Sequence, residues 1–365
     1  MKNMEKIFVT KTFLPPIDEY ISYLRDIWES GMVTNDGPVF QKFERALAEY
    51  TGVNNLVCLG NGTWALQIAI RALDLKGEVI TTPFTHVASS GSLVWEGCTP
   101  VYCDIDEKTL NIDPAKIEAQ ITKDTSAILA VHVYSNPCDI ESIERIAEQY
   151  NLRTIYDGAH AFGAVYKGKS VFDFGDISMA SFNATKAFHT IEGGALFTNN
   201  EDMVTEIRKL AYFGMDEAKN IVQQYGTNAK LIEFCAAMGL VNLKYFEEAV
   251  ARKKELYFRY KERLGANKKI SYQSISDTIN YSYMPIILES SEYKNVIIST
   301  LRDHEVYPRE YFSPSLETVF KNQITCPIAS DISNRILCLP MSDYLTSEQV
   351  DRICDIINGK SNCGK

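Results

Sequence analysis

The chain has 365 residues, of which 45% are hydrophobic and 23% are charged, with a formal net charge of −10 at pH 7. This composition excludes an extended disordered chain, and the net negative charge argues against a general nucleic-acid binder, which needs a basic surface. No stretch approaches the roughly 20 apolar residues of a membrane span, and the first ten residues lack the apolar core of a signal peptide. The nine cysteines form no C-x-x-C pair. We therefore expect a cytoplasmic protein with reduced thiols, no membrane segment and no metal.

The first part of the chain predicts two helices, a strand and a glycine turn. Residues 17–30 and 39–50 carry apolar side chains at helical spacing. Residues 55–59 form an apolar run, followed by Gly-Asn-Gly-Thr at 60–63 and a helical pattern over 65–72. A strand, a glycine turn and a helix can bind phosphate through free backbone N–H groups. The turn matches neither G-x-G-x-x-G nor a P-loop, and a purely structural turn remains the alternative.

Strand and helix patterns then alternate. Strands are predicted at 78–82, 100–104, 127–133 and 153–157, with a small-residue helix start at 87–91 and helices at 114–121 and 141–150. This alternation indicates βαβ units and therefore an α/β fold with a large, doubly wound, mostly parallel sheet. Ligands of such sheets bind at the carboxyl ends of the strands.

A lysine follows the next predicted strand. Two strand-like runs, 177–182 and 195–198, flank a polar loop that holds Lys186 and the pair Gly193 and Gly194. We expect a hairpin or a sheet edge that faces a cavity. A lysine there can lose hydration, and its pKa can then fall far enough for the amine to act as a nucleophile. The alternative is a solvated surface lysine.

The remainder of the chain has a different pattern. Helices are predicted at 202–212, 231–240, 242–264, 292–304 and 347–357, and strands at 281–287 and within 330–339. We therefore predict a large domain over residues 1–240 and a smaller α+β domain over residues 241–365.

Several polar residues at strand ends suggest one cofactor. Asp157 ends a predicted strand and is followed by small residues and His160, while His86 follows the strand at 78–82. Taken singly, Asp157 could be a helix cap and each histidine a hydrogen-bonded core residue. Together with the glycine turn and Lys186 they supply what pyridoxal phosphate needs, namely phosphate donors, an anion for the ring nitrogen and an amine for the aldehyde.

These residues resemble the DegT/StrS family of pyridoxal-phosphate-dependent sugar-nucleotide aminotransferases. The resemblance implies the aspartate aminotransferase fold, that is, fold type I of the pyridoxal phosphate enzymes. The motifs that carry it follow in order along the chain: Asn-Gly-Thr at 61–63, Pro-Phe-Thr-His-Val-Ala at 83–88, Asp-Gly-Ala-His at 157–160, Tyr-Lys-Gly at 166–168, Phe-Gly-Asp at 174–176, Ser-Phe-Asn-Ala-Thr-Lys at 181–186 and Glu-Gly-Gly-Ala at 192–195. The chain departs from the family near residues 135–137, where a glycine is usual, and at Tyr156, where an acidic residue is usual.

The resemblance also implies roles for four residues around the cofactor ring. Lys186 is similar to the Schiff-base lysine, which also transfers the proton, and Asp157 to the aspartate paired with the ring nitrogen. His160 stands where the family has Gln or His near the cofactor hydroxyl. His86 stands where the family has a flat residue stacked on the ring.

Four further residues are implied at the cofactor phosphate. Gly62, Thr63 and Ser181 match phosphate ligands of the family. Asn228 resembles an asparagine that reaches the phosphate of the neighbouring subunit. A homodimer with shared active sites is therefore expected by analogy.

The implied activity is amino transfer from L-glutamate to a nucleotide-linked keto-6-deoxyhexose. The N-terminal patterns at 9–16, 26–28 and 35–38 are similar to those of family members that act at C4 of dTDP-4-keto-6-deoxy-D-glucose. The product of that reaction, dTDP-4-amino-4,6-dideoxy-D-glucose, serves surface polysaccharides such as the O-antigen of lipopolysaccharide. Amination at C3 of a dTDP-3-keto-6-deoxyhexose is one alternative, and a non-catalytic or regulatory member of the fold is another. Dehydratase relatives carry histidine in place of the lysine, so Lys186 argues against that activity. Sugar-nucleotide contacts are expected from the amino-terminal loop and from residues 307–313.

Overall fold

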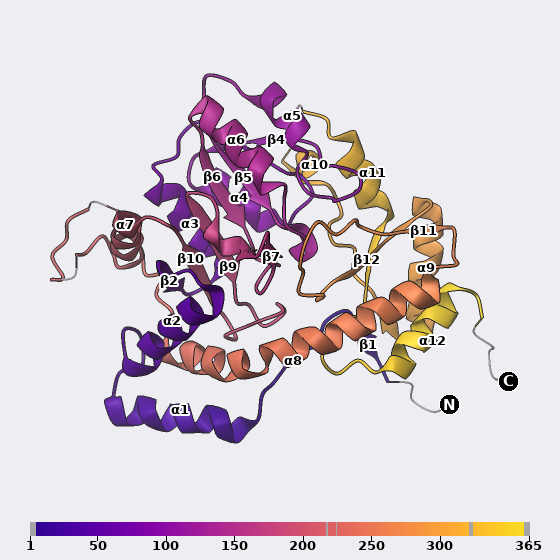
Figure 1. Cartoon of the computed structure of the whole chain (residues 1–365), viewed down its shortest axis with the longest axis horizontal. Helices are drawn as coiled ribbons and strands as arrows, with labels where there is room; N and C mark the ends of the chain where they lie inside the picture. The colour runs from indigo at the N-terminus through magenta and orange to yellow at the C-terminus, as the bar shows by residue number, and fades with distance from the viewer. Residues whose placement is uncertain (1–4, 217, 224, 321–323, 361–365) are drawn as a thin grey trace.

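A seven-stranded sheet forms the centre of the molecule (Figure 1). The computed structural model describes residues 5–216, 218–223, 225–320 and 324–360. The strand order is β2 (Leu56–Leu59), β10 (Gly194–Phe197), β9 (Ile177–Ser181), β6 (Arg153–Asp157), β5 (Thr125–Val131), β3 (Glu78–Thr81) and β4 (Thr99–Tyr102). Strand β10 runs antiparallel to β2 and β9, and the other pairs are parallel. The predicted mostly parallel sheet is confirmed, and the hairpin around Lys186 is formed by β9 and β10.

Helices cover both faces of this sheet. One face packs on α2 (Pro38–Thr51), α6 (Ile140–Tyr150) and the first part of α8 (Glu233–Leu264). The opposite face packs on α3 (Gly62–Ala72), α4 (Val87–Trp95) and α7 (Glu201–Ala211). Neighbouring strand residues alternate between the two cores, as Val57 and Cys58 do. Burial on both faces explains why the strands read as continuous apolar runs.

The later part of the chain forms a smaller antiparallel sheet. It contains β11 (Ile270–Ser271), β12 (Met284–Leu288) and β14 (Ile336–Leu339), covered by α9 (Ser291–Asp303), α12 (Ser347–Ile357) and the end of α8. The amino-terminal β1 (Ile7–Phe8) pairs in parallel with β13 (Val306–Tyr307). The remaining short elements are α5 (Pro114–Ile117), η1 (Glu118–Gln120), η2 (Val133–Ser135), β7 (Val165–Tyr166), β8 (Lys169–Ser170), η3 (Val171–Asp173), α10 (Leu316–Val319) and α11 (Pro327–Arg335).

Helix α8 corrects one prediction from the sequence. The two helices expected at 231–240 and 242–264 are a single continuous helix that runs along both parts of the chain (Figure 1). Gly239 lies inside this helix, and the ring of Phe43 packs so closely against it that an added Cβ would lie 2.4 Å from a ring carbon. The expected division at residue 240 falls inside this helix, and the two domains stay a prediction.

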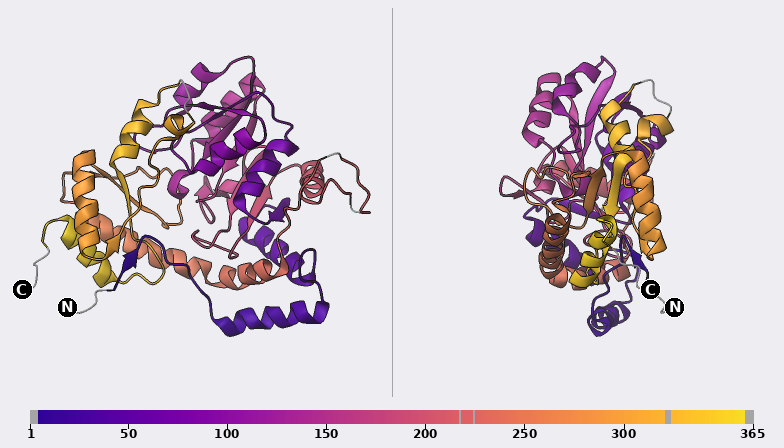
Figure 2. Two further views of the ribbon diagram at one scale, coloured as in Figure 1. Left: turned by 180° about the vertical axis from the view of Figure 1, so that it is seen from behind. Right: turned by 90° about the vertical axis from the view of Figure 1, so that its right-hand side faces the viewer.

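Helix α1 (Ile17–Ser30) lies outside the main body and packs along α8 in every view (Figure 1, Figure 2). Of its side chains only Ile27 is fully buried. Its contacts with α8 include the edge-to-face pair of Trp28 and Phe234 and the ion pair of Glu19 with Lys244. Among the described residues, no helix is long and apolar enough to cross a membrane.

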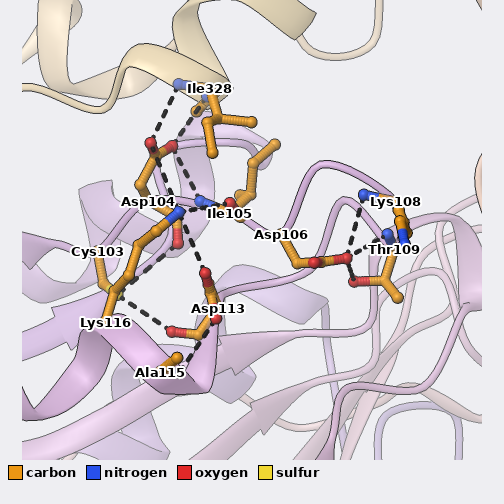
Figure 3. Close-up of polar contacts among 11 residues, drawn as sticks. Cys103, Asp104, Ile105, Asp106, Lys108, Thr109, Asp113, Ala115, Lys116 and Ile328 are labelled. Carbon is orange, nitrogen blue, oxygen red and sulfur yellow. Dashed lines mark hydrogen bonds and ion pairs between the residues drawn. The ribbon is translucent and has the colours of Figure 1, made fainter.

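A buried aspartate ties α11 to the edge of the large sheet (Figure 3). The carboxylate of Asp104, just after β4, accepts hydrogen bonds from the backbone N–H groups of Ile328 (3.0 Å) and Ala329 (2.9 Å). Lys116 Nζ lies 4.0 Å from Asp104 and 3.1 Å from Asp113. Asp104 therefore supplies the acceptor that the first turn of α11 lacks, and it holds residues from the smaller sheet's side against the large one.

Candidate active site

A cavity of about 800 Å³ opens at the carboxyl ends of β3, β6 and β9. Seven of the eight site residues predicted from the sequence line it: Gly62, Thr63, His86, Asp157, His160, Ser181 and Lys186. Its walls also include Thr10 from the amino-terminal loop, Tyr283 immediately before β12, and Tyr311 and Phe312 from beyond β12. The predicted location at strand ends is therefore confirmed, although the role of each residue stays a prediction.

The start of α3 forms one end of the cavity. Asn61 caps the helix, because its side chain accepts the N–H of Trp64 at 2.8 Å. The N–H groups of Gly62 and Thr63 have no intrahelical acceptor and point out of the helix. Ser181, at the end of β9, lies so close that a Cβ on Gly62 would be 2.8 Å from its Cβ. Two N–H groups and the hydroxyls of Thr63 and Ser181 thus converge on a helix N-terminus, which suits a phosphate.

The loop after β9 presents Lys186. Its backbone N–H bonds to the carbonyl of Asn183 at 2.9 Å, and the Asn183 side chain accepts from the Thr185 hydroxyl and donates to Glu192. The loop is therefore fixed locally, with the Lys186 side chain at the cavity wall. Burial lowers the pKa of Lys186 from the ordinary 10.5, and the nearby Asp157 carboxylate opposes this change.

Asp157 lies on the floor of the cavity and is only 4% exposed. One of its carboxylate oxygens accepts a hydrogen bond from the Ser89 hydroxyl at 2.7 Å, and the other accepts the backbone N–H of Ala159 at 3.0 Å. The carboxylate is therefore oriented from two sides, with lone pairs left for a further donor.

His160 is a buried, neutral hydrogen-bond donor. Its Nδ1 accepts the backbone N–H of Tyr134 at 3.3 Å. Burial, together with the charge of Lys186, holds the pKa of His160 well below 6.5, so the ring is neutral and its proton resides on Nε2. The ring stacks on Phe312 with an interplanar angle of 2°.

His86 is an exposed helix cap at the cavity and not the hydrogen-bonded core residue that the sequence left open as the alternative. It is the N-cap of α4, since its Nδ1 accepts the N–H of Ala88 at 3.2 Å, and its exposed ring also lines the cavity. Partial desolvation of the ring at the cavity wall, and then the positive charge of Lys186, lower the pKa of His86 below 6.5. A neutral, flat ring held in one orientation suits stacking on another ring.

Asn228 is the one predicted site residue outside the cavity. It is exposed and forms a β-bridge with Tyr212. The sequence analysis assigned no role to Ser89, Asn183 or Glu192, which orient the central residues. Ser89 bonds to a residue 68 positions away, a contact that no local pattern announces. Asn183 and Glu192 lie in the loop that carries Lys186, and their polar side chains are the sequence signal from which a supporting role could have been predicted.

The residues present fit pyridoxal phosphate. The helix start provides donors for its phosphate, Asp157 an anion for a protonated ring nitrogen, and Lys186 an amine of lowered pKa. No arginine lines the cavity among the described residues.

Comparisons with known proteins agree with this geometry. The model of the DegT/DnrJ/EryC1/StrS aminotransferase family matches residues 17–358. The chain is 42% identical to the dTDP-4-amino-4,6-dideoxy-D-glucose transaminase of Shigella dysenteriae, covering 97% of the chain and 99% of the relative, and 36% identical to the transaminase of that name from Escherichia coli, covering 98% and 100%. It is also similar to the crystal structure of DesI with its TDP-sugar product, with a TM-score of 0.92 and 30% identity over 97% of this chain and 94% of that one. The chain therefore belongs to the DegT/DnrJ/EryC1/StrS aminotransferase family.

Proposed function

We propose that this protein is a pyridoxal-phosphate-dependent transaminase that moves an amino group from L-glutamate to C4 of dTDP-4-keto-6-deoxy-D-glucose, giving dTDP-4-amino-4,6-dideoxy-D-glucose. The observation that carries the proposal is the shared cavity of Lys186, Asp157 and the start of α3. The choice of sugar is supported by the 42% and 36% identical relatives that carry this name.

When bound, pyridoxal phosphate supplies an aldehyde for an amine and a ring that accepts electrons as a proton leaves carbon. Lys186 is the only lysine lining the cavity among the described residues, and its lowered pKa makes its amine available as a base. We assign it both the covalent attachment and the proton transfer. Asp157 would stabilise positive charge on the ring nitrogen, since it is buried and fixed by two donors.

The other predicted residues would bind and orient the cofactor. His160 offers an Nε2–H donor for the cofactor hydroxyl, because its Nδ1 is already occupied. His86 offers a flat ring for stacking. Gly62, Thr63 and Ser181 offer the phosphate donors.

The acceptor sugar would lie against the wall formed by two distant segments. Thr10 belongs to the amino-terminal loop, and Tyr311 and Phe312 belong to residues 307–313, the two regions from which sugar-nucleotide contacts were expected. Tyr134 ties this wall to β5, because its hydroxyl donates to the carbonyl of Tyr311. These contacts support a substrate that approaches from the side of the smaller sheet.

The purified protein should be incubated with pyridoxal phosphate, L-glutamate and each keto-sugar in turn, and the position of the new amine determined by NMR. The proposal expects an amine at C4 and formation of 2-oxoglutarate. An amine at C3 of a dTDP-3-keto-6-deoxyhexose would contradict the assigned position but keep the reaction class. No product with either sugar would contradict both.

We also propose a homodimer with shared active sites. Support comes from exposed apolar side chains, since Trp95 is 78% exposed on the cavity rim and Ile221, in the segment between α7 and α8 that also carries Asn228, is 74% exposed. Mixing inactive Lys186→Ala with Asn228→Ala subunits should restore activity, because one site of each heterodimer is then intact. Activity that stays at the level of the separate variants would contradict sharing.

We propose a cytoplasmic enzyme whose product is used for a surface polysaccharide such as O-antigen. Deletion of its gene should remove the amino sugar from purified lipopolysaccharide, as measured by sugar analysis, and an unchanged composition would contradict this setting.

A further inference from the structure

A directed chain of hydrogen bonds ends on the Asp157 carboxylate. Ser89 Oγ lies 2.7 Å from Asp157 Oδ2 and 3.0 Å from Thr85 Oγ1. A serine hydroxyl has one proton to donate, and Ser89 uses it in the hydrogen bond to the Asp157 carboxylate. Thr85 must therefore donate to Ser89, and the order is Thr85 to Ser89 to Asp157.

This chain is shielded from water. Ser89 is 1% exposed, Thr85 3% and Asp157 4%. Hydrogen bonds in such surroundings are stronger than in water, and successive bonds polarise one another. Ser89 is held by a fixed element, because it lies in the first turn of α4, which begins at Val87 after its N-cap His86.

Nothing else holds this oxygen of Asp157 among the described side chains. Its partner oxygen accepts the backbone N–H of Ala159, which no side-chain substitution removes. Without Ser89 the carboxylate would keep only that one anchor, and its plane could rotate about it.

We propose that Ser89 is a positioning residue for Asp157 and that Thr85 positions Ser89, so that together they aim the carboxylate at the ring nitrogen of the cofactor. This inference rests on the proposed function. It adds a supporting pair made of Ser89 in α4, which contacts the carboxylate, and Thr85 just before that helix, which contacts Ser89.

The test compares Ser89→Ala with Ser92→Ala. Ser92 is the matched control, because it lies on the same helix, is 2% exposed, and its hydroxyl has no hydrogen-bond partner among the described residues. For each variant, pyridoxal phosphate binding should be titrated by absorbance, the visible band of the bound cofactor recorded against pH, and unfolding of the cofactor-free protein followed by circular dichroism.

We expect Ser89→Ala to weaken cofactor binding roughly tenfold, as for a lost hydrogen bond to a charged group, and to shift the pH dependence of the visible band. Ser92→Ala should leave both unchanged. Equal behaviour of the two variants would overturn the inference while leaving the proposed function intact. A wild-type protein that never forms the visible band would overturn the proposed function and the inference with it.

Thr85→Val tests the order of the chain, since valine has nearly the shape of threonine but lacks its hydroxyl. It should weaken binding less than Ser89→Ala does, and it should have no further effect in the Ser89→Ala background. Additive effects in the double variant would show that Thr85 acts independently of Ser89 and would refute the chain.

Discussion

The close contact between Gly62 and Ser181 makes a sharp prediction for Gly62→Ala. The added Cβ would lie 2.8 Å from Ser181 Cβ and 3.0 Å from its Oγ, about 0.6 Å short of the 3.4 Å at which ordinary contact begins. Ser181 cannot retreat easily, because β9 pairs it with Gly194. The start of α3 must therefore move away from the hydroxyl.

The expected loss is larger for the cofactor than for the fold. Overpacking costs about 1–3 kcal/mol, and the better helix propensity of alanine returns up to about 1 kcal/mol, so the free energy of unfolding of the cofactor-free protein should fall by about 0–2 kcal/mol. Separation of Ser181 from the phosphate should cost about 1.5–3 kcal/mol of binding, which is roughly a 10- to 150-fold rise in Kd.

Gly91→Ala is the matched control for this experiment. Gly91 lies inside α4, and an added Cβ there meets nothing within 4 Å, so the variant should gain about 1 kcal/mol of stability and keep its cofactor affinity. Absorbance titration of pyridoxal phosphate and chemical unfolding measure the two quantities. Equal cofactor affinity of Gly62→Ala and Gly91→Ala would refute the placement of the phosphate at the start of α3.

Three further predictions follow from buried charges. Lys186→Ala should abolish amino transfer but keep non-covalent cofactor, as measured by product formation and dialysis-resistant absorbance, and full activity would refute its role. Burial lowers the pKa of Lys186, so covalent capture of the cofactor should rise with pH and reach half of its maximum below 10.5; a midpoint at or above that value contradicts the lowered pKa. Glu233→Ala should lower the free energy of unfolding by about 3 kcal/mol, because the backbone N–H groups of residues 37, 39 and 40 lose their acceptor. Glu248 is exposed on the same helix, so Glu248→Ala should change this free energy by less than about 0.5 kcal/mol. Chemical unfolding measures both.

Local chemistry explains which elements could be predicted. Helix α1 has the predicted bounds because Pro16 precedes it and Gly31 ends it with φ of 66°. The strands of the large sheet were predicted because burial on both faces leaves a continuous apolar run. The helix break expected near residue 241 was wrong: α8 continues through this position, and the nearby Gly239 allows the close approach of the Phe43 ring, a long-range contact, rather than ending a helix.

The candidate site divides in the same way. Lys186, Asp157 and the turn at Gly62 follow strands directly, so their meeting follows from the rule for parallel sheets. The wall at Tyr283 and Tyr311 depends instead on how the smaller sheet packs against the large one. That packing is fixed by contacts far apart in sequence, such as Asp104 with the start of α11, and no local pattern predicts it.

The departure from the family pattern near residue 135 has a structural explanation in the support of His160. Tyr134 and Ser135 both have left-handed backbones, with φ of 54° and 67°, where a glycine would be free of strain. Their side chains offset this cost: the Tyr134 hydroxyl bonds to Tyr311, and Ser135 Oγ accepts the N–H of Asn280 at 3.2 Å. Asn280 in turn donates to the carbonyl of His160 at 2.7 Å. The turn at residues 134 and 135 thus directs the Tyr134 N–H to His160 Nδ1, and through Asn280 it also holds the backbone carbonyl of the same histidine.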